Sequence, residues 1–415
     1  MERKRLIMPK ERSKIYFKNH YQRLPVPFVI YADFEAITEK IDTCQPSNGK
    51  SYTQTYQSHG ACGFDYEVVC HYDQSYSKPV EIYRGEDSIE TFIEKMFEEV
   101  RSRRIVMREH FNQPLKMTAE NERDFRQSTL CHTCGRKFKV SDGNKPVRDH
   151  CHITGEYRGS AHDYCNLKLR IEPEAIKIPV IFHNLKGYDR HFIMQKIGKM
   201  IEDQHVYDVV RVKKDLNKSG TADNLTDGKK KKIDINIIAK KFENYMSFKL
   251  RRHPTLIDSF NFLSQSLDKL SSNLSEDSFI YTKEPLIREK GVYPYDYMDT
   301  FSRFDETSLP KRELFNSQLY DKDISEEEYK RSQKVWDAFR LKNLGEYHDL
   351  FLKSDVLLLT DVFQNFRETS PHHYKLDPCH YLFSPGLSWD AMLKKTKINL
   401  DLISDIDCSC LLKKD

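Results

Sequence analysis

Four carboxylates at the ends of apolar segments are the residues of this sequence that could do chemistry together. Asp33 and Glu35 stand two positions apart in "YADFEA", after the apolar run "PFVI", so a strand points both to one face. Asp189 follows a second apolar segment, and Asp355 lies on an amphipathic one. Carboxylate oxygens suit Mg²⁺ or Mn²⁺ better than Zn²⁺. If the four converge, they predict two divalent ions about 3.5–4 Å apart, which would hydrolyse a phosphodiester.

Each acid taken singly has a simpler interpretation. Most Asp and Glu side chains are exposed, so a lone acid at the end of a strand or helix is usually hydrated rather than bound to a metal. The spacing of the four acids as a set is what favours the metal site.

A second group of residues has the spacing of a zinc site. Cys131-x-x-Cys134 and His162-x-x-Cys165 are two pairs separated by a short loop. Three thiolates and an imidazole make a closed tetrahedral Zn²⁺ site. The N-terminus lacks the apolar core of a secretory signal, so the ten cysteines are expected in a reducing compartment, where C-x-x-C indicates metal binding or redox chemistry before a disulfide.

The elements that must position these residues follow an α/β pattern. Apolar segments predict strands at 26–37, 59–70 and 78–85, and helical spacing predicts a helix at 87–106. After a Cys/His-rich insertion, 175–197 predicts a strand, a turn and a helix, and 253–270 predicts a strand and a helix start. Further helices are expected around 325–339 and over 345–368, and an exposed loop over 211–232.

Composition places the 415-residue chain among globular proteins, with 38% hydrophobic and 31% charged residues and a net charge of +4. The basic residues cluster, as in "MERKRLIMPKERSK" and at Lys229–Lys232. Such runs are usually solvated loops, although they also serve as phosphate contacts or nuclear-import signals. No stretch reaches about 18 consecutive apolar residues, so the sequence predicts no membrane span.

These motifs resemble the 3′→5′ proofreading exonuclease of family B DNA polymerases. "DFE" looks like the first exonuclease motif, "HNLKGYD" like the second and "FLKSD" like the third, while "SLDKL" is similar to a single-strand-binding motif of the protein-primed subgroup. The resemblance begins at about residue 24 and is strongest to the polymerases of Polinton or Maverick transposons and related viruses, through "GVYPYDYMD", "TSLP", "LDPCHY" and "PGLSWDAMLK".

The resemblance implies an RNase H-like exonuclease domain, with a mixed sheet flanked by helices. It implies that the two ions are held, and catalysis is carried out, by Asp33, Glu35, Asp189 and Asp355. It also implies single-stranded or primer–template DNA as the partner, with a terminal priming protein as a further one. The residues expected to contact the strand are Asn184, Tyr188, Phe262, Ser266, Leu267 and Phe351.

One position departs from this family. The third motif normally begins with Tyr, whose hydroxyl helps to orient the attacking water, whereas this chain has Phe351. The ring can still pack, but the hydrogen bond is lost, so we expect slow cleavage.

The Cys/His segment resembles the His-Me finger nucleases of the recombination endonuclease VII type. The resemblance rests on "RDHCH" and on Asn166, which follows the last cysteine. It implies that Asp149 and Asn166 hold one metal ion and that His150 is the general base, since a His can accept a proton near neutral pH. His162 stands where the family usually has Cys. The alternative, which we favour, is a zinc-stapled module that contacts DNA without cleaving it.

The resemblance implies the following organisation: a basic segment at 1–24, the exonuclease domain at 25–125 and 171–370, the insertion at 126–170, and the start of a polymerase palm region at 371–415. "YMDTFS" resembles the palm motif Y-x-D-T-D-S, but Phe301 replaces the second acid and the segment precedes the third exonuclease motif. No other stretch supplies palm aspartates. The chain is therefore expected to be a fragment or truncated copy that does not extend DNA alone.

The expected function is that of the N-terminal part of a DNA-directed DNA polymerase with 3′→5′ exonuclease chemistry, used in replication of a transposable element. Two alternatives stay open, a DNA-binding remnant without activity and a structure-selective endonuclease that uses the inserted module. The expected location is nuclear in a eukaryotic host and otherwise intracellular.

Overall fold

The computed structural model describes residues 8–40, 57–139, 145–187, 189–202, 207–208, 231–232, 235–241, 244–250, 254–316 and 323–404. The chain forms two compact units. Unit 1 contains residues 1–25, 108–173 and 366–415, and unit 2 contains residues 26–107 and 174–365. The N-terminal segment, the Cys/His insertion and the C-terminal segment thus share one unit, a grouping that differs from the separate regions expected from the sequence.

Unit 2 is built on a mixed sheet of seven strands with the order β10-β11-β12-β7-β2-β3-β4. Strands β12 and β2 both run parallel to β7, and the other neighbours are antiparallel. The strands of this sheet are β2 (Phe28–Lys40), β3 (Gln57–Cys70), β4 (Lys78–Arg84), β7 (Pro179–Phe182), β10 (Ile235–Lys241), β11 (Asn244–Leu250) and β12 (Thr255–Asp258).

Helices flank this sheet, as the sequence predicts for an α/β protein. They are α1 (Ser88–His110), α4 (Asp189–Glu202), α5 (Leu267–Ser271), α6 (Glu326–Ala338) and α7 (Leu344–Tyr374), and the short strands β8 (Tyr207–Asp208) and β9 (Lys231–Lys232) pair separately. The expected loop over 211–232 lies mostly outside the described residues. Helix α7 continues through Pro371, where the sequence analysis placed the start of another domain.

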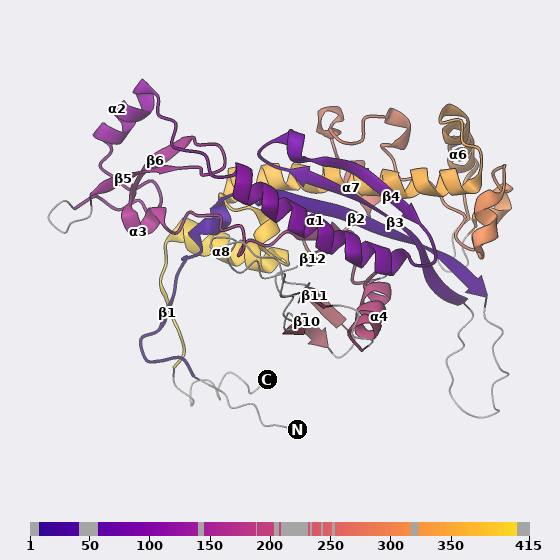
Figure 1. Cartoon of the computed structure of the whole chain (residues 1–415), viewed down its shortest axis with the longest axis horizontal. Coiled ribbons are helices and arrows are strands. Elements are labelled where there is room, and N and C mark those ends of the chain that lie inside the picture. The colour runs from indigo at the N-terminus through magenta and orange to yellow at the C-terminus, as the bar shows by residue number, and fades with distance from the viewer. Residues whose placement is uncertain are drawn as a thin grey trace, which may run out of the picture. The chain divides into compact units, whose positions relative to one another are not determined.

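The period of two along β2 and β3 gives the sheet two unlike faces. Phe34 and Phe64 point to one face, where Phe92 of α1 meets their rings at 4.7 and 5.2 Å between centroids. The residues that alternate with them along the strands point to the opposite face, toward α7, where the ring of Tyr31 contacts that of Phe363. Figure 1 shows α1 and α7 beside β2 and β3. The aromatic core therefore lies under α1, and the face that carries the acids lies under α7.

Unit 1 contains shorter elements. They are β1 (Lys14–Ile15), α2 (Ala119–Gln127), β5 (Pro146–His150), β6 (Tyr157–His162), α3 (Asp163–Asn166), α8 (Ser384–Thr396) and β13 (Leu400–Asp401). Strands β5 and β6 form an antiparallel hairpin, and β1 pairs with β13 near the other end of the described chain. Among the described helices of both units, none combines the length and apolar character needed to cross a bilayer.

Close packing between β3 and α7 gives a test of this arrangement. A Cβ added to Gly63 would lie 2.7 Å from Nε2 of His348 and 3.0 Å from the carbonyl oxygen of Tyr83. His348 is fully buried, and its Nδ1 lies 2.8 Å from the hydroxyl of Tyr293, so the ring cannot easily move. We expect Gly63→Ala to lower the free energy of unfolding by about 1–3 kcal/mol, as overpacking does.

The matched control is Gly60→Ala in the same strand. Its Cβ would meet only Ile37 Cγ1, at 4.0 Å, which is ordinary contact. We expect a change within about 0.5 kcal/mol. Urea unfolding of the two variants measures the difference, and equal effects would contradict the packing of α7 on β3.

Candidate metal centres

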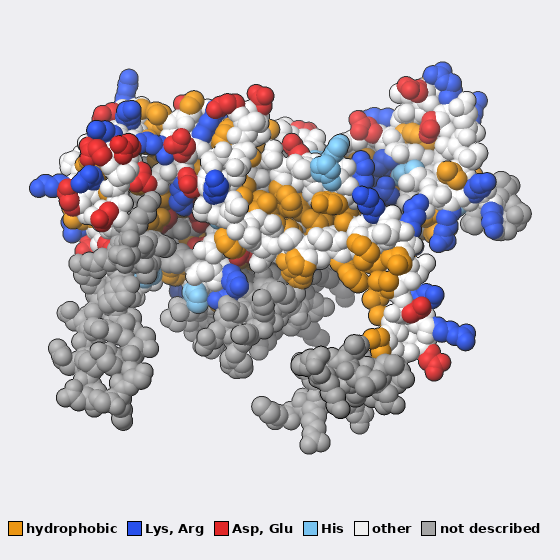
Figure 2. Space-filling view, turned by 180° about the vertical axis from the view of Figure 1, so that it is seen from behind, with side chains coloured by type: hydrophobic (Ala, Val, Ile, Leu, Met, Phe, Trp, Pro, Cys, Tyr) orange, Lys and Arg blue, Asp and Glu red, His pale blue; other side chains and the backbone are white. Residues whose placement is uncertain are grey.

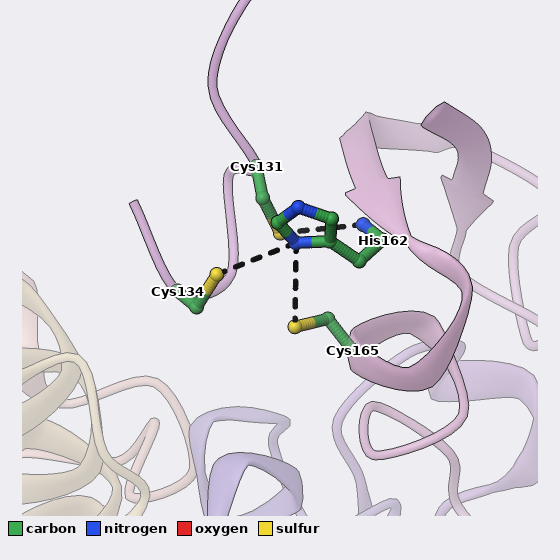
Figure 3. Close-up of side chains that lie close together, drawn as sticks. All are labelled: Cys131, Cys134, His162 and Cys165. Carbon is green, nitrogen blue, oxygen red and sulfur yellow. Dashed lines mark hydrogen bonds between the residues drawn. The ribbon is translucent and has the colours of Figure 1, made fainter. Parts of the chain in front are cut away.

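Four donor side chains meet in unit 1, and they are the four that the sequence predicts to bind zinc. Cys131 and Cys134 flank a turn that is closed by the N–H of Gly135, which donates to the Cys131 carbonyl at 2.8 Å. The φ of 70° at Gly135 is a conformation that glycine adopts readily. His162 ends β6, and Cys165 lies in α3. Figure 3 shows the side chains pointing toward one another, and all donor atoms lie within 4.8 Å.

The distances between these donor atoms suit one tetrahedral ion. Nδ1 of His162 lies 3.5 Å from Cys134 Sγ and 3.9 Å from Cys165 Sγ. Donors at about 2.0–2.3 Å from zinc in a tetrahedron lie about 3.3–3.8 Å from one another. Cys131, His162 and Cys165 are buried, as in structural sites that are closed to solvent. The cluster can therefore hold a metal ion such as zinc.

The electrostatics of the thiols also fit a cation. Burial raises the pKa of the Cys131 thiol, but backbone N–H groups of Cys134, His162 and Thr133 outweigh burial and lower this pKa to about 6. For Cys165, burial and the neighbouring Cys131 and Cys134 raise the pKa to about 12. The protein thus stabilises one thiolate by itself, and a bound dication would stabilise the others.

The residues of the expected His-Me finger are engaged in other contacts. Asp149 is fully buried, and Arg158 donates to both of its oxygens, at 2.9 Å from Nε and 2.7 Å from Nη2. A ring nitrogen of His132 lies 2.8 Å from the same carboxylate. Burial alone raises the pKa of Asp149, but His132 and Arg158 hold this pKa below its ordinary value. The carboxylate therefore has partners that tie the β5–β6 hairpin together.

The other two residues of that expected site lie on the same hairpin and the helix after it. His150 ends β5, where its ring lies 4.5 Å from that of His152, and Asn166 ends α3. Their roles as general base and metal ligand stay predictions.

The four acids of the expected exonuclease site come from three elements of unit 2. Asp33 and Glu35 lie on the α7 face of β2, Asp189 is the first residue of α4, which follows β7, and Asp355 lies on α7. The sequence predicts a strand that ends near these two acids, but β2 continues to Lys40. Because Tyr31 pairs with Ile181, Asp33 and Glu35 lie inside β2, beside the point where β7 ends at Phe182. Glu35, Asp189 and Asp355 are 6%, 3% and 1% exposed, which is rare for acids that lack a cation.

These acids act on one another electrostatically. Burial raises the pKa of the Asp33 carboxyl to about 7, and the neighbouring Asp355 adds to the rise. Burial and then Asp33 raise the pKa of Glu35 well above its ordinary value. The same is true of Asp189, where burial is followed by Asp33 and Glu35. Like charges therefore lie close enough to oppose one another's ionisation.

Lys290 brings a positive charge into this group, and its Nζ lies 2.8 Å from Oδ2 of Asp355. Burial alone lowers the pKa of Lys290, but Asp355, Asp33 and Glu35 outweigh burial and raise it above its ordinary value. Sequence analysis missed this lysine because it lies in an irregular segment without apolar periodicity.

The carboxylates are nevertheless more widely spread than the ligands of a single ion. Within the described residues, the Cys/His cluster is the group of three or more His, Cys, Asp or Glu side chains whose donor atoms all lie within 4.8 Å. The donor set of the acids is oxygen alone, which suits Mg²⁺ or Mn²⁺. Because the acids are spread more widely than the ligands of one ion, a site for two metal ions is a proposal.

A further buried acid was also missed. Asp65 on β3 is the cross-strand neighbour of Asp33 and is fully buried. Neither of its oxygens has a hydrogen-bond partner, and burial followed by Asp349 and Asp33 raises its pKa well above the ordinary value. The alternation in "GFDYEV" was the signal that could have placed Asp65 on the acidic face.

The expected strand-binding residues of the second motif lie at the turn after β7. Asn184 is exposed with a φ of 63°, and its carbonyl accepts the N–H of Gly187 at 2.8 Å. A Cβ on Gly187 would lie 2.6 Å from Oδ1 of Asn184, so the exposed amide of Asn184 lies close over this turn. Tyr188 lies outside the described residues.

The remaining expected contacts differ in how exposed they are. Phe262 is half-buried, with its ring 5.9 Å from that of Phe363. Ser266 is exposed and caps α5, because its hydroxyl accepts the N–H of Lys269 at 3.3 Å. Leu267 is 5% exposed, and its contact with the strand stays a prediction.

Phe351 lies in the core beside the acids. Its side chain is buried and stacks on Tyr293 at 5.0 Å, and Nζ of Lys290 lies 5.7 Å from the ring centre. A small cavity of about 40 Å³ adjoins this ring.

The zinc site gives a direct prediction. Cys165→Ser should remove bound zinc and lower the melting temperature of the chain, because the fourth ligand is lost. The control is Cys151→Ser, since Cys151 follows β5 in the same unit and lies outside the cluster. Metal content by atomic emission measures the outcome. Zinc retained in both variants, or lost in both, would contradict the assignment.

The acids predict an unusual dependence of stability on pH. The native chain holds the Asp33 proton up to about pH 7, whereas an unfolded chain releases it near the ordinary pKa of 3.8. Because the native state binds more protons between these values, the free energy of unfolding falls as the pH rises through this range. Without divalent cations, Asp33→Asn should therefore raise the melting temperature at pH 8 and leave it unchanged below pH 3.8.

Asp277→Asn is the matched control, since Asp277 is exposed in the same unit. It should leave the melting temperature unchanged at both pH values. An Asp33→Asn variant that is less stable than the parent at pH 8 would show that the Asp33 carboxylate is stabilised as an anion.

Comparisons with known proteins complete the description of these sites. No protein-family model, no curated protein and no solved structure matches the chain. What the sequence and structure establish is therefore a mixed α/β unit with an acidic face, joined to a unit with a Cys/His cluster that can bind a metal such as zinc.

Proposed function

We propose that unit 2 is a metal-dependent 3′→5′ exonuclease that shortens single-stranded DNA, and that the chain is the N-terminal part of a protein-primed family B DNA polymerase. The observation that carries the proposal is the set of acids that β2, α4 and α7 bring together beside the end of β7, where burial and acidic neighbours raise the pKa values of Asp33, Glu35 and Asp189. Solvated strand and helix ends would not interact in this way.

The strand order supports the RNase H-like part of the proposal. Strands β2, β3 and β4 form an antiparallel meander, and β7 and β12 extend the sheet on the other side of β2, parallel to it and to each other. The resemblance implies such a mixed sheet flanked by helices, here with Asp33 and Glu35 on β2 between β7 and β3.

The donor set supports divalent cations. Asp33, Glu35, Asp189 and Asp355 would hold them, and when bound such ions supply activation of water and stabilisation of the leaving 3′ oxygen. Lys290 partly neutralises the acids and would also orient Asp355, which its ammonium contacts. Asn184, exposed just after the end of β7, would contact the DNA strand.

A degradation assay tests the proposal. The parent chain should shorten 5′-labelled single strands from the 3′ end with Mg²⁺ or Mn²⁺, and Asp33→Ala/Glu35→Ala should lower the rate by at least about a hundredfold, since the acids act as one unit. Asp277→Ala/Glu284→Ala is the control because both residues are exposed acids of the same unit. Equal rates in the parent and the double variant would refute the proposal, and no degradation by either would leave the DNA-binding remnant.

The absence of a tyrosine hydroxyl at Phe351 predicts that a substitution can raise the nuclease activity. Phe351→Tyr should raise the turnover number on single-stranded DNA, because a hydroxyl beside the acids can orient the attacking water, and the adjoining cavity gives the larger ring room to adjust. The gain should vanish in the Asp33→Ala background. An unchanged rate in a variant with the parent's melting temperature would show that the hydroxyl has no role here.

A further inference from the structure

Unit 1 contains a cavity of about 910 Å³ that the proposed exonuclease does not use. Three segments line it, which are distant in sequence: residues 16–23, 132–168 and 373–399. Seven of the lining residues are lysine or arginine, three are histidine, and none is aspartate or glutamate. Figure 2 shows one contiguous group of lysine and arginine side chains, with histidine beside it, to the right of the centre of its view.

Local structure explains only part of this charge. Lys375 and Lys397 follow the ends of α7 and α8, where a helix dipole favours cations. Lys395 lies in the last turn of α8 and has the same explanation, whereas Arg136 and Lys168 have no such position relative to a long helix end. All three are exposed and line the cavity. The residues that line the cavity therefore hold more positive charge than the fold itself accounts for.

The charges in the cavity also repel one another. Burial, followed by Arg23 and Lys375, lowers the pKa of Lys394 to about 8. Burial, followed by Arg23, Lys168 and Lys394, lowers the pKa of His20 to about 4. An anion in the cavity would relieve this repulsion.

Aromatic side chains alternate with the cations. Tyr16, Tyr164 and Tyr374 line the cavity with 51%, 41% and 48% of their surface exposed. Tyr164 stacks on His162 at an interplanar angle of 16°, and Nζ of Lys168 lies 5.5 Å from its ring centre, so the ring is held in place. Exposed rings among cations provide stacking platforms for bases beside contacts for phosphates.

We infer that this cavity binds a single strand of nucleic acid, with lysine and arginine contacting its phosphates and Tyr16, Tyr164 and Tyr374 stacking on its bases. A duplex presents mainly phosphates to a protein surface, since its bases are stacked inside, and would leave these rings unused. An acidic peptide would pair with the cations and likewise leave the rings without a planar partner.

This inference is independent of the exonuclease, because every residue that lines the cavity belongs to unit 1. The binding experiment therefore uses the whole chain carrying Asp33→Ala/Glu35→Ala, which prevents degradation of the probe. The probes are fluorescein-labelled 12-nucleotide strands of mixed sequence, as DNA and as RNA, and affinity is measured by fluorescence anisotropy over a salt series.

The cavity variant is Arg136→Gln/Lys168→Gln/Lys395→Gln, which removes two cations from the 132–168 segment and one from the 373–399 segment. It should weaken binding of the strand at least tenfold and reduce the slope of log affinity against log salt by about 2, since each lost phosphate contact lowers it by about 0.7. The charge-matched control is Lys10→Gln/Arg123→Gln/Lys139→Gln, with exposed residues of unit 1 outside the cavity, and it should change affinity less than threefold.

A separate variant tests whether bases stack on the tyrosine rings. Tyr16→Leu/Tyr374→Leu keeps every charge and should weaken binding about tenfold or more without changing the salt slope, because base stacking is not screened by salt. Circular dichroism and zinc content confirm that each variant folds.

Three results would overturn the inference. They are equal losses in the cavity and control variants, a 12-base-pair duplex that competes as well as the strand, and a poly-glutamate peptide that competes as well as the strand. Tighter binding of DNA or of RNA would support it in either case and identify the preferred strand.

Discussion

The alternation of side chains along β2 is the constraint on which the rest of unit 2 depends. Alternate residues of this strand point to opposite faces of the sheet. Phe34 points into the aromatic core under α1, whereas Asp33 and Glu35 point to the face under α7. Helix α7 therefore cannot be apolar on its whole inner side, and it brings Asp355 and His348 to that face. A shift of one residue in the pairing of β2 with β3 would exchange the core and the acids.

The two candidate metal centres stabilise negative charge in different ways. Around Cys131, backbone N–H groups of a tight turn favour the thiolate, so the site is prepared by local structure. Around Asp33 and Glu35, burial and like charges oppose ionisation, and Lys290 is a cation that the fold supplies. Unsatisfied electrostatics of this kind are typical of functional sites, where some stability is given up for a task other than folding.

Sequence analysis predicted the elements with strong patterns and missed relations that no local pattern encodes. The apolar runs of β2, β3 and β7 and the helical spacing of α1 and α7 gave these elements within a few residues. The spacing of Cys131, Cys134, His162 and Cys165 gave a cluster that the structure confirms as able to hold a metal. Lys290 could not be found, because its position depends on how an irregular segment packs. The grouping of both ends of the chain with the insertion depends on contacts between distant residues, which periodicity does not report.

The pairing of the two ends of the described chain sets an order for folding during synthesis. A ring nitrogen of His380 contacts the carbonyl oxygen of Leu24, 356 residues away, and β1 pairs with β13. The segment with β1 and Leu24 must therefore wait until residues 380–401 have left the ribosome before it finds these partners. All of unit 2 precedes residue 366, so it can fold before unit 1 is complete. The N-terminal segment is made first and reaches its native contacts last.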